Sequence, residues 1–328
     1  MDRRRSAIAM LALAALGSST FVEAQPSARP RRLGVLGMSN PVVVRTFMAA
    51  FRDELARLGW VEGQNLQVTY RFAGGDAARM PSLAAELVAL EPDVLYSTNA
   101  QGSLALAHAT SRIPVVMSAL DSPAAMDLVR SLARPGGNVT GTAFGTPVLG
   151  GKRLEIVKEW VPRASRLAVI YDAAETSDAA ALDALRAGAN HFQMQIEPLS
   201  AGNLSEIRGA FDALSKNPPD AIYVFANVPN ITNKEVICAE ALRIRVPTMA
   251  TYSYFADSGC LVSYGFLEDE FAREGARLVN QILRGANPAD VPVRQPTQFE
   301  LVINARTAAS LGLAIPPKLK VMADRVIE

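Results

Sequence analysis

The sequence predicts an α/β protein with two Rossmann-like lobes, each built on a parallel sheet, and three observations favour this fold class. Short apolar or β-branched runs alternate with helical patterns along the chain, which is typical of parallel strands buried on both faces. The 328 residues exceed what one hydrophobic core usually organises. Hydrophobic residues make up 49% of the chain, which favours large buried sheets over disorder.

The first half of the chain contains four expected strands separated by helical patterns. These strands are Leu33–Gly37, Leu66–Phe72, Asp93–Ser97 and Pro114–Ser118. Between the first two strands, Phe47, Phe51, Leu55 and Leu58 recur at helical spacing and predict one buried helix face. Gly59 then ends this helix.

The second half repeats the arrangement without a convincing sequence repeat. Its expected strands are Arg166–Asp172, Met194–Ser200, Ala221–Asn227, Pro247–Thr251 and Leu261–Gly265. Phe271, Leu278 and Ile282 then fall in phase and predict a further buried helix.

Three segments are expected to carry the chain between the lobes, because each follows a turn-rich break rather than a full helix. They are Asn138–Phe144, Cys260–Phe266 and Thr297–Ile303. Before the first of them, Pro135 cannot continue a helix, and Gly136 and Gly137 admit backbone angles that other residues avoid. Three crossings predict a hinge between the lobes rather than a single linker.

The N-terminus has the pattern of a secretory signal peptide. Arg3, Arg4 and Arg5 form a positive region, an apolar run follows from Ala7 to Gly17, and small residues at Val22 and Ala24 precede an expected cleavage site before Gln25. The apolar run is shorter than the roughly 20 residues that cross a bilayer. We therefore expect residues 1–24 to be removed on export, leaving a periplasmic protein.

Charge and cysteine content exclude several function classes. Removal of residues 1–24 takes away three Arg, one Asp and one Glu, so the mature chain is close to neutral and offers no electrostatic footprint for nucleic acid. The two histidines, His108 and His191, and the two cysteines lack ligand spacing, so no metal or other cofactor is expected. Cys238 falls on an expected helix and Cys260 opens an expected strand. The sequence does not decide whether the two cysteines form a disulfide, and the separate elements on which they fall favour unpaired cysteines.

Four stretches of the chain resemble one known family. They are SLARPGGNVTG (131–141), LGWVEGQNLQVTYRFAGGD (58–76), LVSYG (261–265) and QPTQFELVINARTAASLGLAIPPKL (295–319). The chain from about Arg31 onward is similar to ABC-transporter substrate-binding proteins related to tryptophan and tyrosine uptake. The resemblance implies the type I periplasmic binding fold, with an N-lobe of residues 32–140 plus 263–294 and a C-lobe of residues 141–262 plus 295–328. It also implies a small-molecule ligand and a membrane permease as partners, and we expect a monomer.

Polar residues at the ends of the expected strands are the candidate ligand contacts, because ligands bind beyond the carboxyl ends of parallel strands. In the first lobe, helix capping is an alternative role for the polar pairs that precede helices. Ordinary packing near the hinge is the alternative for Tyr252 and Tyr264 of the second lobe. The candidates are Ser39, Asn40, Ser97, Thr98, Asn99, Ser118, Asp121, Phe144, Asp172, Asn227, Tyr252 and Tyr264.

These residue types suit a small zwitterion. Helix N-termini after the first-lobe strands would receive a carboxylate, and Asp121 or Asp172 would receive an ammonium group. The resemblance favours the loops at Ser39, 97–99 and Asp172 as cleft edges. The family often has Asp-Pro-Val where this chain has Asp121-Ser122-Pro123-Ala124, and often a glycine pair where it has Gly259-Cys260.

Two fragments imitate catalytic motifs, and both lack a required residue. The segment 37–41 resembles a nucleophile elbow, but Pro41 replaces the closing glycine and no His is placed to activate Ser39. The segment 145–153 resembles a phosphate loop, but Arg153 stands where Ser or Thr should bind magnesium.

The sequence therefore predicts a periplasmic solute-binding component of an ABC uptake transporter that is not an enzyme. Its ligand would be a small organic solute, with an amino acid as one candidate, held between the lobes by hinge closure. The alternatives are a ligand-sensing module for a membrane receptor and, less favoured, an α/β hydrolase.

Overall fold

The computed structural model describes residues 29–39, 41, 44–118, 123–143, 146–295 and 297–328. The chain divides into two units, Met1–Pro30 and Arg31–Glu328, and the second carries the helices and strands described below. The expected signal peptide and three candidate residues, Asn40, Asp121 and Phe144, lie outside the described residues.

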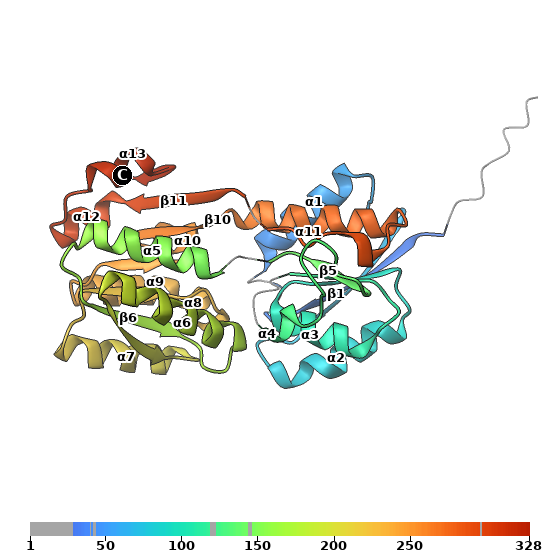
Figure 1. Cartoon of the computed structure of the whole chain (residues 1–328), viewed down its shortest axis with the longest axis horizontal. Coiled ribbons are helices and arrows are strands. Elements are labelled where there is room, and N and C mark those ends of the chain that lie inside the picture. Colours follow the sequence, from blue (N-terminus) through green and yellow to red (C-terminus); the bar gives the residue numbers. More distant parts are fainter. Residues whose placement is uncertain (1–28, 40, 42–43, 119–122, 144–145, 296) are drawn as a thin grey trace, which may run out of the picture. The chain divides into compact units, whose positions relative to one another are not determined.

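The first sheet has five parallel strands in the order β2-β1-β3-β4-β5, and β1 and β5 are labelled in Figure 1. They are β1 (Arg31–Gly37), β2 (Leu66–Phe72), β3 (Val94–Ser97), β4 (Val115–Met117) and β5 (Val139–Gly141). The strands expected from the sequence match these closely, and β2 matches at both ends. Buried Val, Leu and Tyr side chains on both faces explain why these short runs form parallel strands.

Helices cover both faces of the first sheet. One face packs against α1 (Arg45–Arg57) and α11 (Glu268–Leu283), which lie side by side. Phe47, Phe51 and Leu55 of α1 are buried as expected, and Gly59 beyond the helix has a φ of 95°. The other face packs against α2 (Met80–Ala89) and α3 (Ala100–Ala109), and the short α4 (Pro123–Met126) contacts α3.

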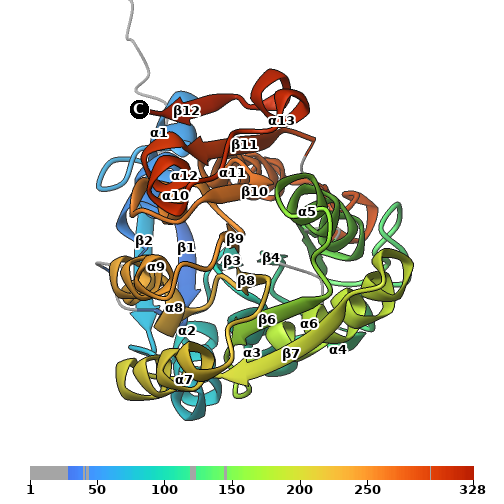
Figure 2. The ribbon, with the colours of Figure 1, turned by 90° about the vertical axis from the view of Figure 1, so that its left-hand side faces the viewer.

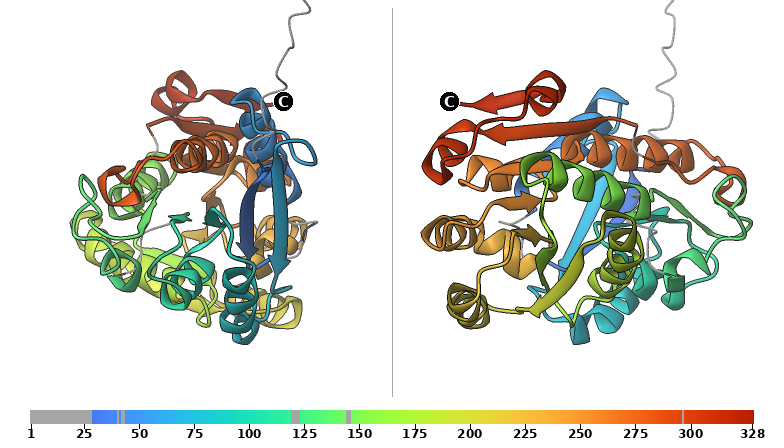
Figure 3. Two further views of the ribbon diagram at one scale, coloured as in Figure 1. Left: turned by 90° about the vertical axis from the view of Figure 1, so that its right-hand side faces the viewer. Right: turned by 60° about the vertical axis from the view of Figure 1, so that its left-hand side comes forward.

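The second sheet has seven strands in the order β12-β11-β10-β9-β8-β6-β7 (Figure 2). They are β6 (Arg166–Tyr171), β7 (Gln195–Ser200), β8 (Ala221–Val224), β9 (Thr248–Ala250), β10 (Val262–Phe266), β11 (Phe299–Asn304) and β12 (Arg325–Ile327). The expectation of purely parallel sheets is wrong at one pair, because β10 and β11 run antiparallel. The edge strand β12 pairs parallel with β11 and was not expected from the sequence (Figure 3).

Helices also lie on both faces of the second sheet. One core contains residues of α5 (Thr146–Trp160), α6 (Thr176–Ala189), α12 (Ala305–Leu311) and α13 (Pro317–Met322). The opposite core contains residues of α7 (Leu204–Lys216), α9 (Lys234–Arg243) and α10 (Ser253–Asp257), and α8 (Val228–Thr232) precedes α9.

Residues in or beside the three expected crossing segments contact one another. Thr142 forms an isolated bridge with Arg294, and the N–H of Ala143 donates to the carbonyl oxygen of Arg294 at 2.8 Å. The second and third segments pair as β10 and β11, and the N–H of Leu267, directly after the second segment, donates to the carbonyl oxygen of Gln298 at 3.4 Å. The expected lobe boundary at residue 263 falls inside β10, whose pairing with β9 and β11 places 263–266 in the second sheet. The remaining lobe boundaries stay a prediction.

Cys238 and Cys260 form a disulfide, with their Cα atoms 4.7 Å apart. The expectation that they stay unpaired is wrong. Both are buried in the core between α9, α10 and the second sheet, beside Phe255, and this packing brings the helix and the strand entry together.

Candidate functional site: a cavity lined by both sheets

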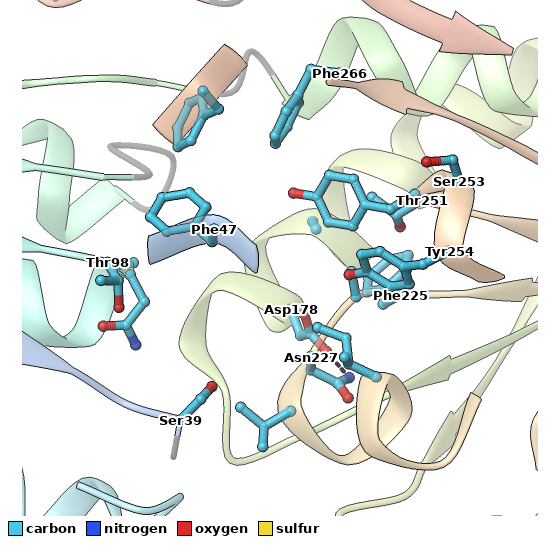
Figure 4. A pocket seen from close by; sticks show the side chains of 18 of the residues that line it. Ser39, Phe47, Thr98, Asp178, Phe225, Asn227, Thr251, Ser253, Tyr254 and Phe266 are labelled. Atoms are coloured by element: carbon cyan, nitrogen blue, oxygen red, sulfur yellow. Dashed lines mark hydrogen bonds between the residues drawn. The ribbon is translucent and has the colours of Figure 1, made fainter. Parts of the chain in front are cut away.

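The described residues of both lobes line a cavity of about 930 Å³ (Figure 4). On the first-lobe side its lining comes from the end of β1, the start of α1, the β3–α3 turn and the start of α11. On the second-lobe side it comes from α5, α6, the loop after β8 and the loop after β9. The cavity therefore lies where the carboxyl ends of parallel strands meet helix N-termini.

Ser39, Thr98 and Asn99 form a polar edge on the first-lobe side of the cavity. They lie close because β1 and β3 are neighbours in the sheet and end at the same edge. Oδ1 of Asn99 accepts a hydrogen bond from the N–H of Gly102 at 3.1 Å and so caps α3. A side chain at Gly102 would crowd this turn, because its Cβ would lie 2.6 Å from Oγ of Ser97.

The hydroxyls of two other first-lobe candidates form hydrogen bonds within the fold. The hydroxyl of Ser97 is buried and donates to the carbonyl oxygen of Asn99 at 2.8 Å. The hydroxyl of Ser118 is buried and donates to the phenolic oxygen of Tyr96 at 3.0 Å. Neither Ser97 nor Ser118 belongs to the cavity lining.

The carboxylate of Asp178 faces the cavity from the first turn of α6 (Figure 4). Its side chain is only 6% exposed, and Oδ2 accepts hydrogen bonds from Nδ2 of Asn227 at 2.6 Å and from the N–H of Asp172 at 2.9 Å. Burial raises the pKa of Asp178 to about 6, although both hydrogen bonds favour its charged form. Among the described residues no cation forms an ion pair with it.

Asp172 does not line the cavity, contrary to its expected role as an ammonium contact. Its Oδ1 accepts a hydrogen bond from the N–H of Ala174 at 2.9 Å, so the side chain closes a local turn after β6. Asp178, six residues later, does line the cavity.

Three other charged groups of the cavity lining, on α11 and α9, already have partners or lie in solvent. Glu270 of α11 accepts from Nη1 of Arg277 at 2.6 Å, and Arg277 also donates to the buried carboxylate of Glu54 at 2.9 Å. Nζ of Lys234 lies 2.9 Å from the carboxylate of Glu235, and Asp269 is exposed. Asp178 is thus the buried carboxylate of the lining that has no cationic partner among the described residues.

Aromatic rings form the apolar wall of the cavity. Tyr252 meets Phe266 edge to face at 5.0 Å between ring centroids, and Phe266 stacks on Phe271 at 4.9 Å. Phe47 and Phe225 complete this wall (Figure 4). The first of these is on α1 and the second follows β8, so the wall includes residues of both lobes.

Tyr264 was a candidate contact and lies outside the cavity lining. Its ring stacks near Phe299 at 6.0 Å, and its carbonyl oxygen accepts from Nε of Arg153 at 2.7 Å. Asn227 and Tyr252, the other second-lobe candidates, do line the cavity.

Sequence reasoning missed Asp178, Arg153, Phe47 and Phe225 as cavity residues. In the sequence, Asp178 has the pattern of an ordinary acidic residue in the first turn of a helix. Phe47 has the pattern of a core residue of a helix. Of these four residues, only Arg153 lies in a motif that the sequence analysis considered. That motif, segment 145–153, resembles a phosphate loop and does not predict a solute-binding cavity.

The described residues contain no group of three His, Cys, Asp or Glu side chains that could hold a metal ion. Neither histidine, His108 nor His191, belongs to the lining of the cavity. In this same part of the chain, no helix has the length and apolar character needed to span a bilayer.

Two α/β lobes, three crossing segments and a cavity lined by both lobes define the type I periplasmic binding class of solute-binding proteins. Residues 41–327 match the family described as ABC transporter substrate binding protein, and the chain belongs to this family. The family and the solute-binding function expected from the sequence are confirmed. Its members are exported binding components that deliver a small solute to an ABC permease.

Relatives and solved structures agree with this assignment. The chain is 26% identical over 280 residues to the tyrosine-binding protein of Clostridioides difficile, covering 85% of this chain and 78% of the relative. The crystal structure of a conserved domain protein from Vibrio cholerae is similar with a TM-score of 0.84 at 26% identity, covering 91% of this chain and all of the other. A domain from Streptococcus pneumonia in complex with L-Trp has a TM-score of 0.83 at 24% identity over the same shares.

Proposed function

We propose that this protein binds an amino acid with an aromatic or large apolar side chain. The observation that carries the proposal is the buried carboxylate of Asp178, which faces the cavity without a cationic partner among the described residues. An ammonium group of the ligand would supply the missing positive charge. A buried charge is costly unless it is paired, so this contact is worth more than an exposed ion pair.

The carboxylate of the ligand would bind at the first-lobe edge. Thr46 and Phe47 of the cavity lining belong to the first turn of α1, and Val44 at its N-cap provides no side-chain cap. The first N–H groups of a helix lack partners within the helix and favour an anion. The hydroxyls of Ser39 and Thr98 lie on the same edge and can donate to it.

The remaining part of the cavity suits the side chain of such an amino acid. Its volume of about 930 Å³ falls within the usual size range of small-molecule sites, and rings such as Phe47, Tyr252 and Phe266 can stack on an aromatic ligand. The named ligand of the Clostridioides difficile relative, tyrosine, has the same chemistry.

Binding would proceed by hinge closure. A ligand that contacts Asp178 from the second lobe and the α1 edge from the first binds the closed form better than the open form, and shifts the population by that difference. The closed form would then be recognised by the permease.

We further propose that the protein acts as a monomer in the periplasm after cleavage near Ala24. It would not bind nucleic acid and would catalyse no reaction on its ligand. The near-neutral charge of the mature sequence supports the absence of a nucleic-acid footprint.

Calorimetric titration of the purified and refolded protein tests the proposal with three related molecules. L-Phenylalanine carries both charged groups, 3-phenylpropanoate lacks the ammonium and 2-phenylethylamine lacks the carboxylate. We expect only molecules with both groups to bind tightly, with D-glucose as the negative control. Tight binding of a sugar and none of any amino acid would refute the proposal.

A further inference from the structure

Arg153 is a buried cation in the wall of the cavity. It lies on α5 and is 4% exposed. Its Nε donates to the carbonyl oxygen of Tyr264 at 2.7 Å, and Nη1 donates to the phenolic oxygen of Tyr223 at 2.7 Å. The guanidinium carbon also lies 5.7 Å from the centroid of the Tyr223 ring.

The partners of Arg153 leave its charge and part of its hydrogen-bonding capacity unused. Both are neutral oxygens, and among the described residues no Asp or Glu forms an ion pair with this guanidinium. The two N–H groups of Nη2 form no hydrogen bond within the same part of the chain. Because a buried guanidinium is favourable only when its donors are satisfied, an acceptor that arrives through the cavity would complete the site.

Arg153 and Asp178 contact different ends of one stretch of chain. Arg153 is bonded to Tyr223 inside β8, whereas Asp178 is bonded to Asn227, four residues further along. Four residues of extended chain span at most about 13 Å. Phe225 lies between them in sequence and also lines the cavity. The second lobe thus offers a carboxylate, an aromatic surface and a guanidinium in that order along this stretch.

We propose that Arg153 selects ligands that carry an oxygen acceptor at the end remote from their ammonium group. The inference rests on the proposed function, in which Asp178 holds the ammonium. The acceptor is a hydroxyl, a carbonyl or a carboxylate oxygen that receives a hydrogen bond from Nη2. Arg153 therefore determines which amino acid is preferred, while Asp178 and the α1 edge bind the part that all amino acids share.

Matched ligand pairs test this selectivity by titration calorimetry. L-Phenylalanine is compared with L-tyrosine and 4-carboxy-L-phenylalanine, and L-norleucine with L-2-aminoadipate, so that each comparison adds only a distal oxygen group. We expect the wild type to bind the oxygen-bearing member of at least one comparison about 10- to 100-fold more tightly, as for a hydrogen bond to a charged group. L-Tyrosine offers a neutral oxygen acceptor, whereas 4-carboxy-L-phenylalanine and L-2-aminoadipate offer an anionic one, so their affinities show which kind of acceptor Arg153 prefers.

Variants separate Arg153 from the general charge of the cavity. In Arg153→Met the preference should fall to about 1 while L-phenylalanine or L-norleucine binds as before, and Arg153→Lys should restore part of it. The matched control is Arg273→Met, which removes a half-buried cation from the lining at α11 and should keep the preference. If Arg153→Met does not fold, the inference is tested by the preference of the wild type and by the preference of Arg153→Lys.

Three results would overturn the inference and leave the proposed function intact. They are equal binding of both members of every pair by the wild type, a preference that survives in Arg153→Met, and a loss as large in Arg273→Met. Failure of every amino acid to bind would instead remove the proposed function, and the inference with it.

Discussion

Replacement of Asp178 by Asn should make the protein more stable and a poorer binder at the same time. The carboxylate is 6% exposed and, among the described residues, has no cation beside it. An Asn oxygen can still accept the hydrogen bonds that Asp172 N–H and Asn227 donate, so the local structure is kept. The variant therefore removes a buried negative charge and little else.

The expected change in the free energy of unfolding follows from the raised pKa of Asp178. Burial raises the pKa of Asp178 from 3.8 to about 6, a shift of roughly two units, and each unit corresponds to about 1.4 kcal/mol. Above pH 6 the wild type carries this cost in the folded state, so the variant should gain roughly 3 kcal/mol in free energy of unfolding. As the pH falls from about 6 toward 3.8 the carboxyl becomes protonated first in the folded and then in the unfolded state, so the difference should be small at pH 4.

The magnitude for binding follows from the lost ammonium contact. A hydrogen bond to a charged group is worth about 1.5–3 kcal/mol, so affinity for an amino acid should fall about 10- to 100-fold. Urea unfolding of the ligand-free protein at pH 4 and pH 8 measures the first effect, and calorimetric titration at pH 8 measures the second. The control is Asp172→Asn, which changes a carboxylate outside the cavity lining.

Two results would refute this reasoning. If the variant binds amino acids as well as the wild type, Asp178 does not hold the ammonium. If its stability relative to the wild type is the same at both pH values, the carboxylate does not carry the cost that its burial implies.

Three further outcomes are expected. Amino-acid affinity of the wild type should fall by up to about tenfold per pH unit below pH 6, because protonation of Asp178 removes its charge, and titrations from pH 5 to 8 should show a plateau above the pKa. Cys238→Ser with Cys260→Ser should lower the free energy of unfolding by about 3 kcal/mol, and a reductant should then have no further effect on urea unfolding. Gly265→Ala should cost about 1–3 kcal/mol or more, because its Cβ would lie 2.0 Å from the carbonyl oxygen of Thr251. In the same unfolding assay Gly209→Ala, on an open helical position of α7, should cost nothing, and equal effects of the two glycine variants would contradict the steric argument.

Local patterns in the sequence were enough to predict much of the order of strands and helices. The run Leu66–Phe72 alternates and forms β2 over the same residues, and Phe47, Phe51 and Leu55 bury one face of α1 as their spacing predicts. Such features depend on side-chain periodicity within one element, which the sequence displays directly.

Contacts between distant elements were not accessible in the same way. The sequence does not show that β11 returns antiparallel to β10, nor that α9 brings Cys238 to Cys260, because both depend on how separate elements pack. The strand-end rule found Ser39, Thr98 and Asn99 at the cavity edge, but it could not tell them from Ser97, whose hydroxyl is used inside the fold.

The sequence by itself determined the α/β class and the cavity edge formed by strand ends, because periodicity and strand polarity are local properties. Only the tertiary structure decided which charges face the cavity. Asp178 rather than Asp172 does so because the turn after β6 uses one carboxylate and α6 directs the other inward. Arg153 joins it because α5 packs on β8 and β10, and no spacing along the chain encodes that contact.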